Sequence, residues 1–475
     1  MRRWAPLVIA LAAAMVFTAR ATYDPDLFWH LAQGREVLAG HLVHTNLFNA
    51  TMAAYPQAYT SWLFETVLAG AARAAGMGGI QLLQILWIAG AVLALYASAR
   101  VRHSWTAAMV VLLLSLFVIE PRAMPRPYLL SWIGLAACAY VIERWRAGTA
   151  TARMDMGVLV LLCVWANFHS EAVFGAGLIG LFGVCEFARP SGISRNAAAR
   201  VIAIGTAGFL ATLATPYGIG MWRYLFENTF VPQALRIAEL LPASPAAYPA
   251  FFVYLAVLVA LLASQPRRLS LSEAVVVVVF AALGMRFIRF MPMVVCATAP
   301  LVASRIDALI ERGWDRRAVL VTAVAVMAAT APASPMRMLK AWRVGADAVA
   351  PPDVFSSDAI AFARAHQLSG PLFNSMNLGG YLTWMLPEAR VFQDSRLQAV
   401  PSAHFTAIID ASASPERWRA LVSGVDWAMV SLARPNELSG VGQFAPDEWA
   451  SVFRDRAVEI FVRRNGRFGH VVPRT

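Results

Sequence analysis

Lysine is almost absent from this sequence, and charged residues of every kind are scarce. Lys340 is the only lysine among 475 residues, and Asp, Glu, Lys and Arg together make up 14% of the chain. Hydrophobic residues make up 59%, and the mean hydropathy is +0.57. This composition excludes an ordinary soluble protein and predicts a polytopic membrane protein.

The formal net charge of +12 is not spread evenly along the chain. Residues 346–475 contain 12 Arg against 13 Asp and Glu, so the positive excess lies in the first 345 residues. Membrane proteins gather Arg in their cytoplasmic connections, whereas a nucleic-acid-binding protein carries a basic face on its soluble part. The sequence therefore predicts the lipid bilayer as a partner and excludes nucleic acid.

Several common chemical motifs are also missing. The four cysteines lie inside apolar runs without metal-ligand spacing, so we interpret them as small buried hydrophobic residues. The sequence shows no Ser-His-Asp triad, no zinc spacing, no P-loop and no Gly-x-Gly-x-x-Gly stretch. These absences disfavour nucleotide binding and hydrolysis by the usual constellations.

Apolar stretches long enough to cross a bilayer, or nearly so, recur along the first 338 residues. Connections rich in Arg alternate with connections rich in aromatic residues, proline and acids. With about eleven spans, all the Arg-rich connections fall on one side, which the positive-inside rule makes cytoplasmic. The stretches are 4–20, 79–99, 104–119, 128–143, 155–168, 171–187, 201–214, 246–264, 269–285, 288–303 and 318–334.

This topology predicts a cytoplasmic N-terminus and a C-terminal part on the outer side. Residues 1–338 form the predicted membrane domain, with an outer loop at 21–78. We interpret the first span as an uncleaved anchor. Residues 60–76 are ambiguous: as a span they would invert everything after them, and we interpret them as a helix lying at the outer boundary.

The composition changes after Met338, and residues 346–475 predict a small α/β domain outside the membrane, because short strands alternate with helices. The predicted strands include Phe373-Asn374, Arg390–Asp394, Asp426–Ser431 and Val458–Arg463, and the predicted helices are Asp358–Ala365, Gly379–Leu386, Ala403–Ala411 and Pro415–Val422.

Two carboxylates stand at the start of the outer loop. Asp24 and Asp26 flank Pro25, and three aromatic residues follow at once. Proline stiffens the backbone, and aromatic rings favour the membrane–water boundary. Such a pair can take a proton from a hydroxyl or bind a divalent ion such as Mg²⁺ or Mn²⁺. A solvated helix cap is the alternative interpretation.

Arginines recur in the connections assigned to the outer side. Arg122 and Arg126 lie in a proline-rich loop after Glu120, and Arg286 and Arg289 flank Phe287. Guanidinium groups in such places suit a phosphate, and intramembrane arginines usually face a cavity or a partner. For Arg122 and Arg126, snorkelling to the membrane surface is the alternative.

Other polar residues allow structural or functional interpretations. His169 and Glu171 at a turn fit a structural histidine or a proton relay. Glu65 can pair with Arg73 or join the acidic pair. Asp394 and Arg396 fit an internal ion pair or a contact with substrate, and a glycine-containing turn near Gly379 can bind an anion at a helix start.

Together these residues resemble a group of bacterial membrane proteins with an Asp-Pro-Asp-x-Trp-Trp-His-Leu-x-x-Gly stretch after the first span, which look like relatives of the GT-C glycosyltransferases. The matching stretches cover nearly the whole chain. They are Asp24–Leu31 with Gly34, Trp62–Glu65, Trp165–His169, Pro216–Gly218, Arg286–Pro292, Asn377–Trp384 and Phe392–Arg396.

The resemblance implies an α-helical polytopic GT-C-like fold and a transferase of the bacterial inner membrane. It would move a sugar from a polyprenyl-phosphate donor to an envelope acceptor on the periplasmic side. The implied roles are base for Asp24 or Asp26 and phosphate binding for Arg122, Arg126, Arg286 and Arg289. Supporting roles fall to Trp29, His30, Glu65, His169, Glu171, Tyr217, Asn377, Tyr381, Asp394 and Arg396.

The sequence departs from this group at three positions. Phe28 replaces a usual Trp, Ser170 a usual Gly, and Asn46 stands where another Asp is expected. Loss of the acid at position 46 leaves catalysis to Asp24, Asp26 and Glu65. A non-catalytic GT-C-like protein that binds lipid or partners in envelope assembly is therefore the alternative. A transporter is disfavoured, because the polar residues collect on one face.

Overall fold

The computed structural model describes residues 4–19, 23–57, 60–230, 238–265, 269–331, 343–396, 399–435 and 438–472. The chain forms two compact units. The first comprises Met1–Ala19 and Leu82–Ala341, and the second comprises Arg20–Gln81 and Trp342–Thr475. The predicted boundaries at residues 338 and 346 stay a prediction.

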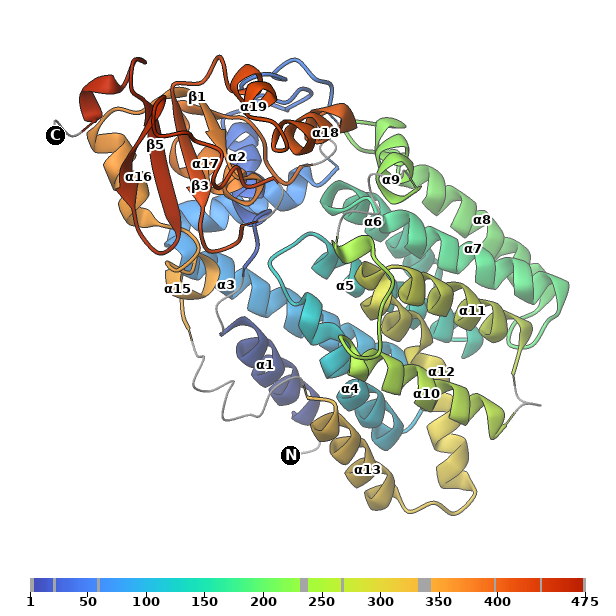
Figure 1. The fold of residues 1–475 in the computed structure, drawn as a ribbon. Helices are drawn as coiled ribbons and strands as arrows, with labels where there is room; N and C mark the ends of the chain where they lie inside the picture. Colours follow the sequence, from blue (N-terminus) through green and yellow to red (C-terminus); the bar gives the residue numbers. More distant parts are fainter. Residues whose placement is uncertain are drawn as a thin grey trace. The chain divides into compact units, whose positions relative to one another are not determined.

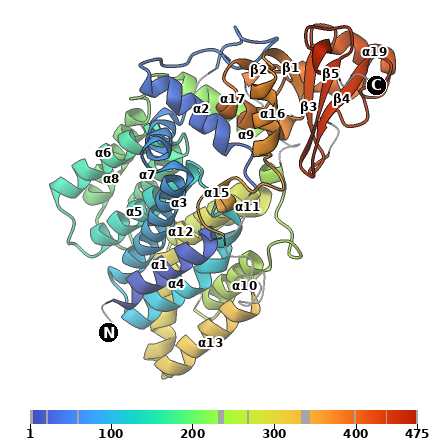
Figure 2. The same cartoon turned by 90° about the vertical axis from the view of Figure 1, so that its left-hand side faces the viewer.

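The first unit is a bundle of helices, and each predicted apolar stretch coincides at least in part with a helix, with residues 20 and 332–334 outside the described residues. Helices α7 and α8 lie side by side in both views (Figures 1 and 2). The helices that carry the stretches are α1 (Ala5–Thr18), α3 (Trp62–Arg100), α4 (Trp105–Ile119), α5 (Tyr128–Arg146), α6 (Ala152–Phe168), α7 (Ala172–Ala188), α8 (Arg195–Ala211), α10 (Pro249–Ala263), α11 (Leu271–Arg286), α12 (Met291–Glu311) and α13 (Arg316–Ala329).

Within the described residues, 3 helical stretches are long and apolar enough to cross a bilayer: Trp62–Arg100, Trp105–Arg122 and Ile288–Glu311. Three shorter helices, α1, α7 and α10, are also apolar. A mostly helical, multi-pass protein is thereby confirmed. The count of about eleven spans, argued from the positive-inside rule, and the orientation stay predictions.

Glycines let the bundle close tightly around Trp165. A Cβ on Gly134 of α5 would lie 2.4 Å from the Trp165 ring, and one on Gly175 of α7 would lie 2.5 Å from it. The indole of α6 is therefore clamped between two backbones that carry no side chain. The clamp fixes the end of α6, from which His169 follows.

Helix α3 is broken between its two ends. Ala75 (φ −141°, ψ 20°) and Gly76 (φ 59°, ψ −151°) leave helical geometry, and only glycine adopts the second conformation readily. Residues 62–74 thus form a separate arm that belongs to the second unit. The predicted helix at 60–76 is present, and its place at the membrane boundary stays a prediction.

The second unit contains a five-stranded mixed sheet of order β2-β1-β3-β5-β4. Strand β1 pairs in parallel with β2 and β3, and β5 pairs antiparallel with β3 and β4 (Figure 2). The strands are β1 (Gly370–Asn374), β2 (Ala389–Val391), β3 (Trp427–Ser431), β4 (Trp449–Arg454) and β5 (Val458–Arg463).

The C-terminal α/β prediction is confirmed, with one strand missed. Strands β1, β2, β3 and β5 overlap the predicted ones, and β4 was not predicted. The predicted helices correspond to α16 (Ser357–Ala365), α17 (Gly379–Met385), α18 (Ser402–Ala411) and α19 (Pro415–Leu421). Strand β4 pairs only with β5 at the sheet edge, and only its first two residues, Trp449 and Ala450, are buried, so the buried apolar run is too short to mark a strand.

The outer loop folds onto the C-terminal part within this unit. Helix α2 (Leu27–Leu38) packs beside α17 (Figure 1). A Cβ on Gly380 would lie 2.7 Å from the Pro25 carbonyl oxygen, and one on Gly34 would lie 2.0 Å from the Glu65 carbonyl oxygen. These glycines therefore bring α17, the acidic turn, α2 and α3 into backbone contact.

Candidate functional site

The acidic turn is held by its own backbone. An Asp24 carboxylate oxygen accepts the Asp26 N–H at 3.1 Å, and Asp24 is buried. Asp26 occupies the N-cap position of α2, but its side chain does not cap the helix. The Asp26 carboxylate therefore does not cap α2, as the alternative interpretation would require. Asp26 is the more exposed of the two acids.

Aromatic rings surround this turn. Phe28 contacts Phe355 and Tyr381 at ring-centroid distances of 4.9 and 5.0 Å, and Tyr23 stacks on Phe355 at 6.1 Å. Burial, opposed by Arg434 and reinforced by the two aspartates, raises the pKa of Tyr23, so its hydroxyl keeps its proton. Phe28 is part of this aromatic cluster.

Asn377 and Tyr381 join the turn from the C-terminal part of the same unit. Asn377 lies beside the Tyr23 hydroxyl. Burial raises the pKa of Tyr381 to about 12. The predicted anion site at the start of α17 is instead occupied by protein, because a Cβ on Gly379 would lie 2.1 Å from the Gln393 carbonyl oxygen.

A buried polar network runs from α2 to the end of β2. His30 Nδ1 lies 3.0 Å from Glu65 Oε1. With its amide oriented by the hydrogen-bonding pattern, Gln33 donates to Glu65 at 2.7 and 3.1 Å and accepts from Arg396 Nη1 at 3.1 Å. Glu65 therefore pairs with His30 and not with Arg73, which was one of the two predictions for this acid.

Arg396 is the centre of this network. It pairs with Asp394, with Nε 3.0 Å from Oδ1, and both side chains are buried. Its Nη2 also donates to Asn46 Oδ1 at 2.9 Å, while Asn46 Nδ2 donates to the Ala399 carbonyl oxygen at 2.9 Å. Position 46 therefore needs a donor and an acceptor, which an amide supplies and an ionised acid does not.

In the first unit, two of the predicted phosphate-binding arginines share one acid. Arg122 Nη2 lies 2.5 Å from Glu239 Oε2, and Arg126 Nη1 lies 3.6 Å from the same oxygen. Burial opposes ionisation of Glu239, but Arg122, Arg126 and Arg289 outweigh it and hold its pKa well below the ordinary value. Glu239, in a 3₁₀ turn (Ala238–Leu240), has no sequence signal, because its partner Arg122 lies 117 residues away.

A second acid engages Arg289. Arg289 Nη2 donates to Glu171 Oε1 at 2.8 Å, and His169 Nδ1 lies 3.2 Å from Glu171 Oε2. Ser131 contacts His169 Nδ1 at 2.8 Å and accepts from the Trp165 indole at 3.1 Å. Burial is outweighed by His169 and Arg289, so the pKa of Glu171 falls to about 2.

Two further predicted residues lie near this cluster in the chain. Arg286 ends α11, is exposed, and approaches the Leu240 carbonyl oxygen at 3.5 Å. Tyr217 lies in the turn before α9 (Gly220–Phe230), where its N–H donates to Thr215 Oγ1 at 3.3 Å. Arg286 is therefore the most accessible of the predicted phosphate ligands.

Metal binding by Asp24 and Asp26 stays a prediction. Among the described residues, no group of three or more His, Cys, Asp or Glu side chains gathers in a way that could hold an ion. The prediction of Mg²⁺ or Mn²⁺ rests on the two aspartates alone.

No family model matches the chain, and no curated protein matches it. Solved structures do. The archaeal oligosaccharyltransferase AglB from Archaeoglobus fulgidus, in complex with an inhibitory peptide and a dolichol-phosphate, aligns with a TM-score of 0.64 at 11% identity, covering 90% of this chain and 69% of that one.

ArnT from Cupriavidus metallidurans, bound to undecaprenyl phosphate, aligns with a TM-score of 0.57 at 14% identity, covering 99% of both chains. The likeness extends over the whole chain, including the C-terminal sheet. At these identities it shows the fold alone. The protein has a GT-C-like membrane fold, as the sequence resemblance led us to expect.

Proposed function

We propose that this protein is a bacterial inner-membrane glycosyltransferase. It takes a sugar from a polyprenyl-phosphate donor and transfers it to an envelope acceptor on the periplasmic side. The observation that carries the proposal is the acidic turn, fixed between α2 and α17, in a chain whose whole length has the fold of a protein solved with undecaprenyl phosphate.

Asp26 is the better base of the two aspartates. Asp24 already spends a carboxylate oxygen on the Asp26 N–H and is buried. Asp26 is more exposed and is not used as a helix cap. Asp24 therefore fixes the turn, and Asp26 takes the proton from the acceptor hydroxyl, a step worth on the order of 10²–10⁴-fold in rate.

The bonds formed and broken in the proposed reaction balance one another, and no cofactor is needed. The acceptor oxygen forms a bond to the anomeric carbon as its proton passes to Asp26. The bond from that carbon to the phosphate oxygen breaks, and its electron pair leaves with the polyprenyl phosphate. The sequence resemblance assigns stabilisation of the departing negative charge to Arg286, Arg289, Arg122 and Arg126, and this role stays a separate prediction. A divalent ion at Asp24 and Asp26 remains a separate prediction, tested by adding Mg²⁺ or Mn²⁺.

Turnover by purified protein tests the proposal. Protein in lipid nanodiscs is incubated with a panel of undecaprenyl-phosphate-linked hexoses and pentoses and with envelope extract as acceptor. We expect release of undecaprenyl phosphate, lost by at least 10²-fold in Asp26→Asn and kept in Asp353→Asn, a control acid that is exposed in the same unit. Equal turnover by Asp26→Asn and wild type would overturn Asp26 as the base.

The pairing of arginines with acids in the first unit favours one alternative function. Arg122, Arg126 and Arg289 are neutralised by Glu239 and Glu171, as in a structural cluster. A GT-C-like protein that binds lipid or envelope partners without catalysis would show this arrangement. Binding of the donor panel without turnover would establish that alternative.

A further inference from the structure

A second charged region lies in the first unit, at the opposite helix ends from the Glu171 cluster. A cavity of about 350 Å³ is bordered there by the ends of α5 and α7, the start of α11 and the turn after α3. Three arginines from different elements, Arg102, Arg146 and Arg189, line it. These connections are ones that the sequence assigns to the cytoplasmic side.

Arg146 is fixed at the floor of this cavity. Its Nη1 lies 2.9 Å from Glu143 Oε1, its Nη2 donates to Ser272 Oγ at 3.0 Å, and Glu273 Oε1 lies 3.7 Å from Nη1. Arg102 also reaches Glu143, at 3.1 Å. The floor is therefore a built polar surface rather than a chance meeting of flexible side chains.

The loop that carries Arg189 is anchored as well. The buried carboxylate of Glu186 accepts the N–H groups of Ser191 and Gly192, each at 2.8 Å. It also accepts the Ser272 hydroxyl at 2.7 Å, which ties this loop to α11. Residues 189–192 are thus held at the rim of the cavity by a single acid.

Among the described residues, Arg189 is the arginine of this cavity that has no acidic partner. Its side chain is exposed and makes no ion pair or side-chain hydrogen bond within the part of the chain that the structure describes. Arg102 and Arg146, by contrast, have Glu143 and Glu273 as partners. An anion that enters the cavity therefore meets one unneutralised arginine and the outer N–H groups of two others.

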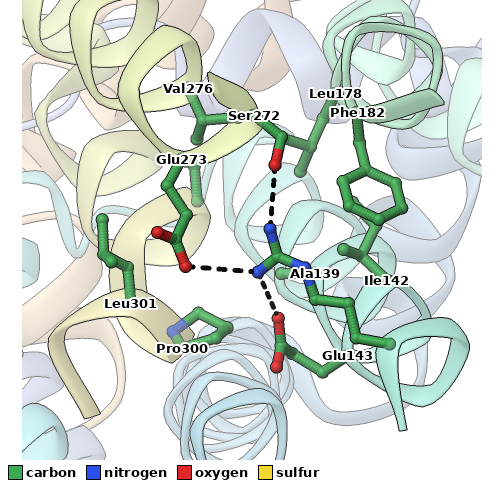
Figure 3. Close-up of a pocket in the computed structure, with 12 residues that line it drawn as sticks. Ala139, Ile142, Glu143, Leu178, Phe182, Ser272, Glu273, Val276, Pro300 and Leu301 are labelled. Atoms are coloured by element: carbon green, nitrogen blue, oxygen red, sulfur yellow. Dashed lines mark hydrogen bonds and ion pairs between the residues drawn. The ribbon is translucent and has the colours of Figure 1, made fainter. Parts of the chain in front are cut away.

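The cavity is lined mainly by charged and polar groups, but exposed apolar side chains lie close to Arg189 in the sequence. Val184 and Phe187 on α7 are 53% and 48% exposed, and Leu271, which lines the cavity, is 37% exposed. Such side chains in a membrane protein face acyl chains. A separate small recess shares Arg146 and Glu273 with this cavity and is also lined by apolar residues such as Phe182 and Leu301 (Figure 3). A phosphate that reaches Arg189 beside this surface belongs to an amphiphile.

We propose that the Arg102–Arg146–Arg189 cavity binds the headgroup phosphate of an anionic phospholipid. Basic pockets between membrane helices on the cytoplasmic side take such headgroups. The site is separate from the donor site of the proposed glycosyl transfer, since it uses none of its residues.

Lipid binding by the purified full-length chain tests the site. The probe is a fluorescent phosphatidylglycerol, added to protein in phosphatidylcholine nanodiscs. We expect Arg189→Gln to weaken its binding about fivefold. Arg195→Gln, a matched exposed arginine at the start of α8 that does not line the cavity, should leave binding unchanged. Neither variant breaks an internal ion pair, so both should fold.

Three outcomes would overturn the proposal. Equal losses in Arg189→Gln and Arg195→Gln would mean that general surface charge binds the lipid. Phosphatidylcholine carries the same phosphate but no net charge, so equal binding of a fluorescent phosphatidylcholine would mean that the cavity does not select an anionic phospholipid. Displacement of the probe by inorganic phosphate at millimolar concentration would mean that the cavity takes a free anion. None of these readouts depends on glycosyl transfer.

Discussion

In the buried network of the second unit, Arg396 gathers one acid and several neutral amides, whereas in one cluster of the first unit three arginines meet two acids. The contacts of Arg396 with Asn46 and Gln33 use amide groups that are satisfied on both sides. Glu239 and Glu171 are instead simple counter-ions for Arg122, Arg126 and Arg289.

This difference separates a network that fixes geometry from one that can exchange partners. Amides in a closed network cannot give up a contact without leaving a buried group unpaired. A carboxylate that faces two guanidiniums occupies a position that suits a phosphate oxygen equally well. We therefore expect substitutions in the Arg396 network of the second unit to destabilise the protein strongly, and the Glu171 and Glu239 cluster of the first unit to respond to anions and to pH.

Arg396→Ala is expected to lower the free energy of unfolding more than any other variant considered. Removing the guanidinium leaves the Asp394 carboxylate buried without its charge partner and also strips contacts from Asn46 and Gln33. Loss of one partner of a buried pair costs about 3–5 kcal/mol. Thermal and denaturant unfolding in detergent measure the loss, and Arg390→Ala, exposed on the neighbouring strand β2, is the control. Equal effects of the two variants would contradict a network centred on Arg396.

Asn46→Asp tests the network from its other side. The change introduces the acid that the sequence resemblance led us to expect, but it removes the donor to the Ala399 carbonyl oxygen. We expect a loss of about 1–3 kcal/mol in unfolding free energy, the cost of an unsatisfied buried group.

Transfer assays on the same variant should show no gain in activity. A rise in turnover would mean that the acid at position 46 serves catalysis and that the amide of this chain is a defect. Asn46→Ala separates the two effects, because it lacks both the donor and the acid.

Local patterns predicted the helices and most strands but not the partners across the network. Strand β3 is buried at every residue, and its apolar run Trp427–Ser431 could be recognised at once. Gln33 lies three residues after His30 on α2, so its approach to the same acid could have been inferred from helical spacing.

Other site residues carried no local signal. Glu239 and Ser131 meet Arg122 and His169 only because the helix bundle brings distant segments together. At position 46 the sequence showed only that an expected acid is missing. The role of Asn46 depends on its contacts with Arg396 and Ala399, which lie 350 and 353 residues away. Sequence reasoning finds residue types suited to chemistry, but long-range packing decides which of them are already paired.

Acid lability of the first unit is the smallest expected effect. The pKa of Glu171 falls from 4.5 to about 2 on folding, because His169 and Arg289 outweigh the effect of burial. A carboxyl whose pKa is depressed on folding stabilises the protein above its unfolded value and loses that contribution as the pH falls towards its folded value. The window is therefore about pH 4.5 down to 2, and at pH 4 the loss from this group is about 1 kcal/mol.

Free energies of unfolding measured between pH 7 and pH 3 test whether acid destabilises the protein and whether Glu171 is the group responsible. Glu171→Gln should be less stable than wild type at pH 7, because Arg289 loses its partner, and should lose less stability below pH 4.5. Glu388→Gln, an exposed control in the second unit, should follow the wild-type curve. If Glu171→Gln and wild type fell in parallel, Glu171 would not carry the acid response. Its pairing with Arg289 would then not distinguish the first unit from the second.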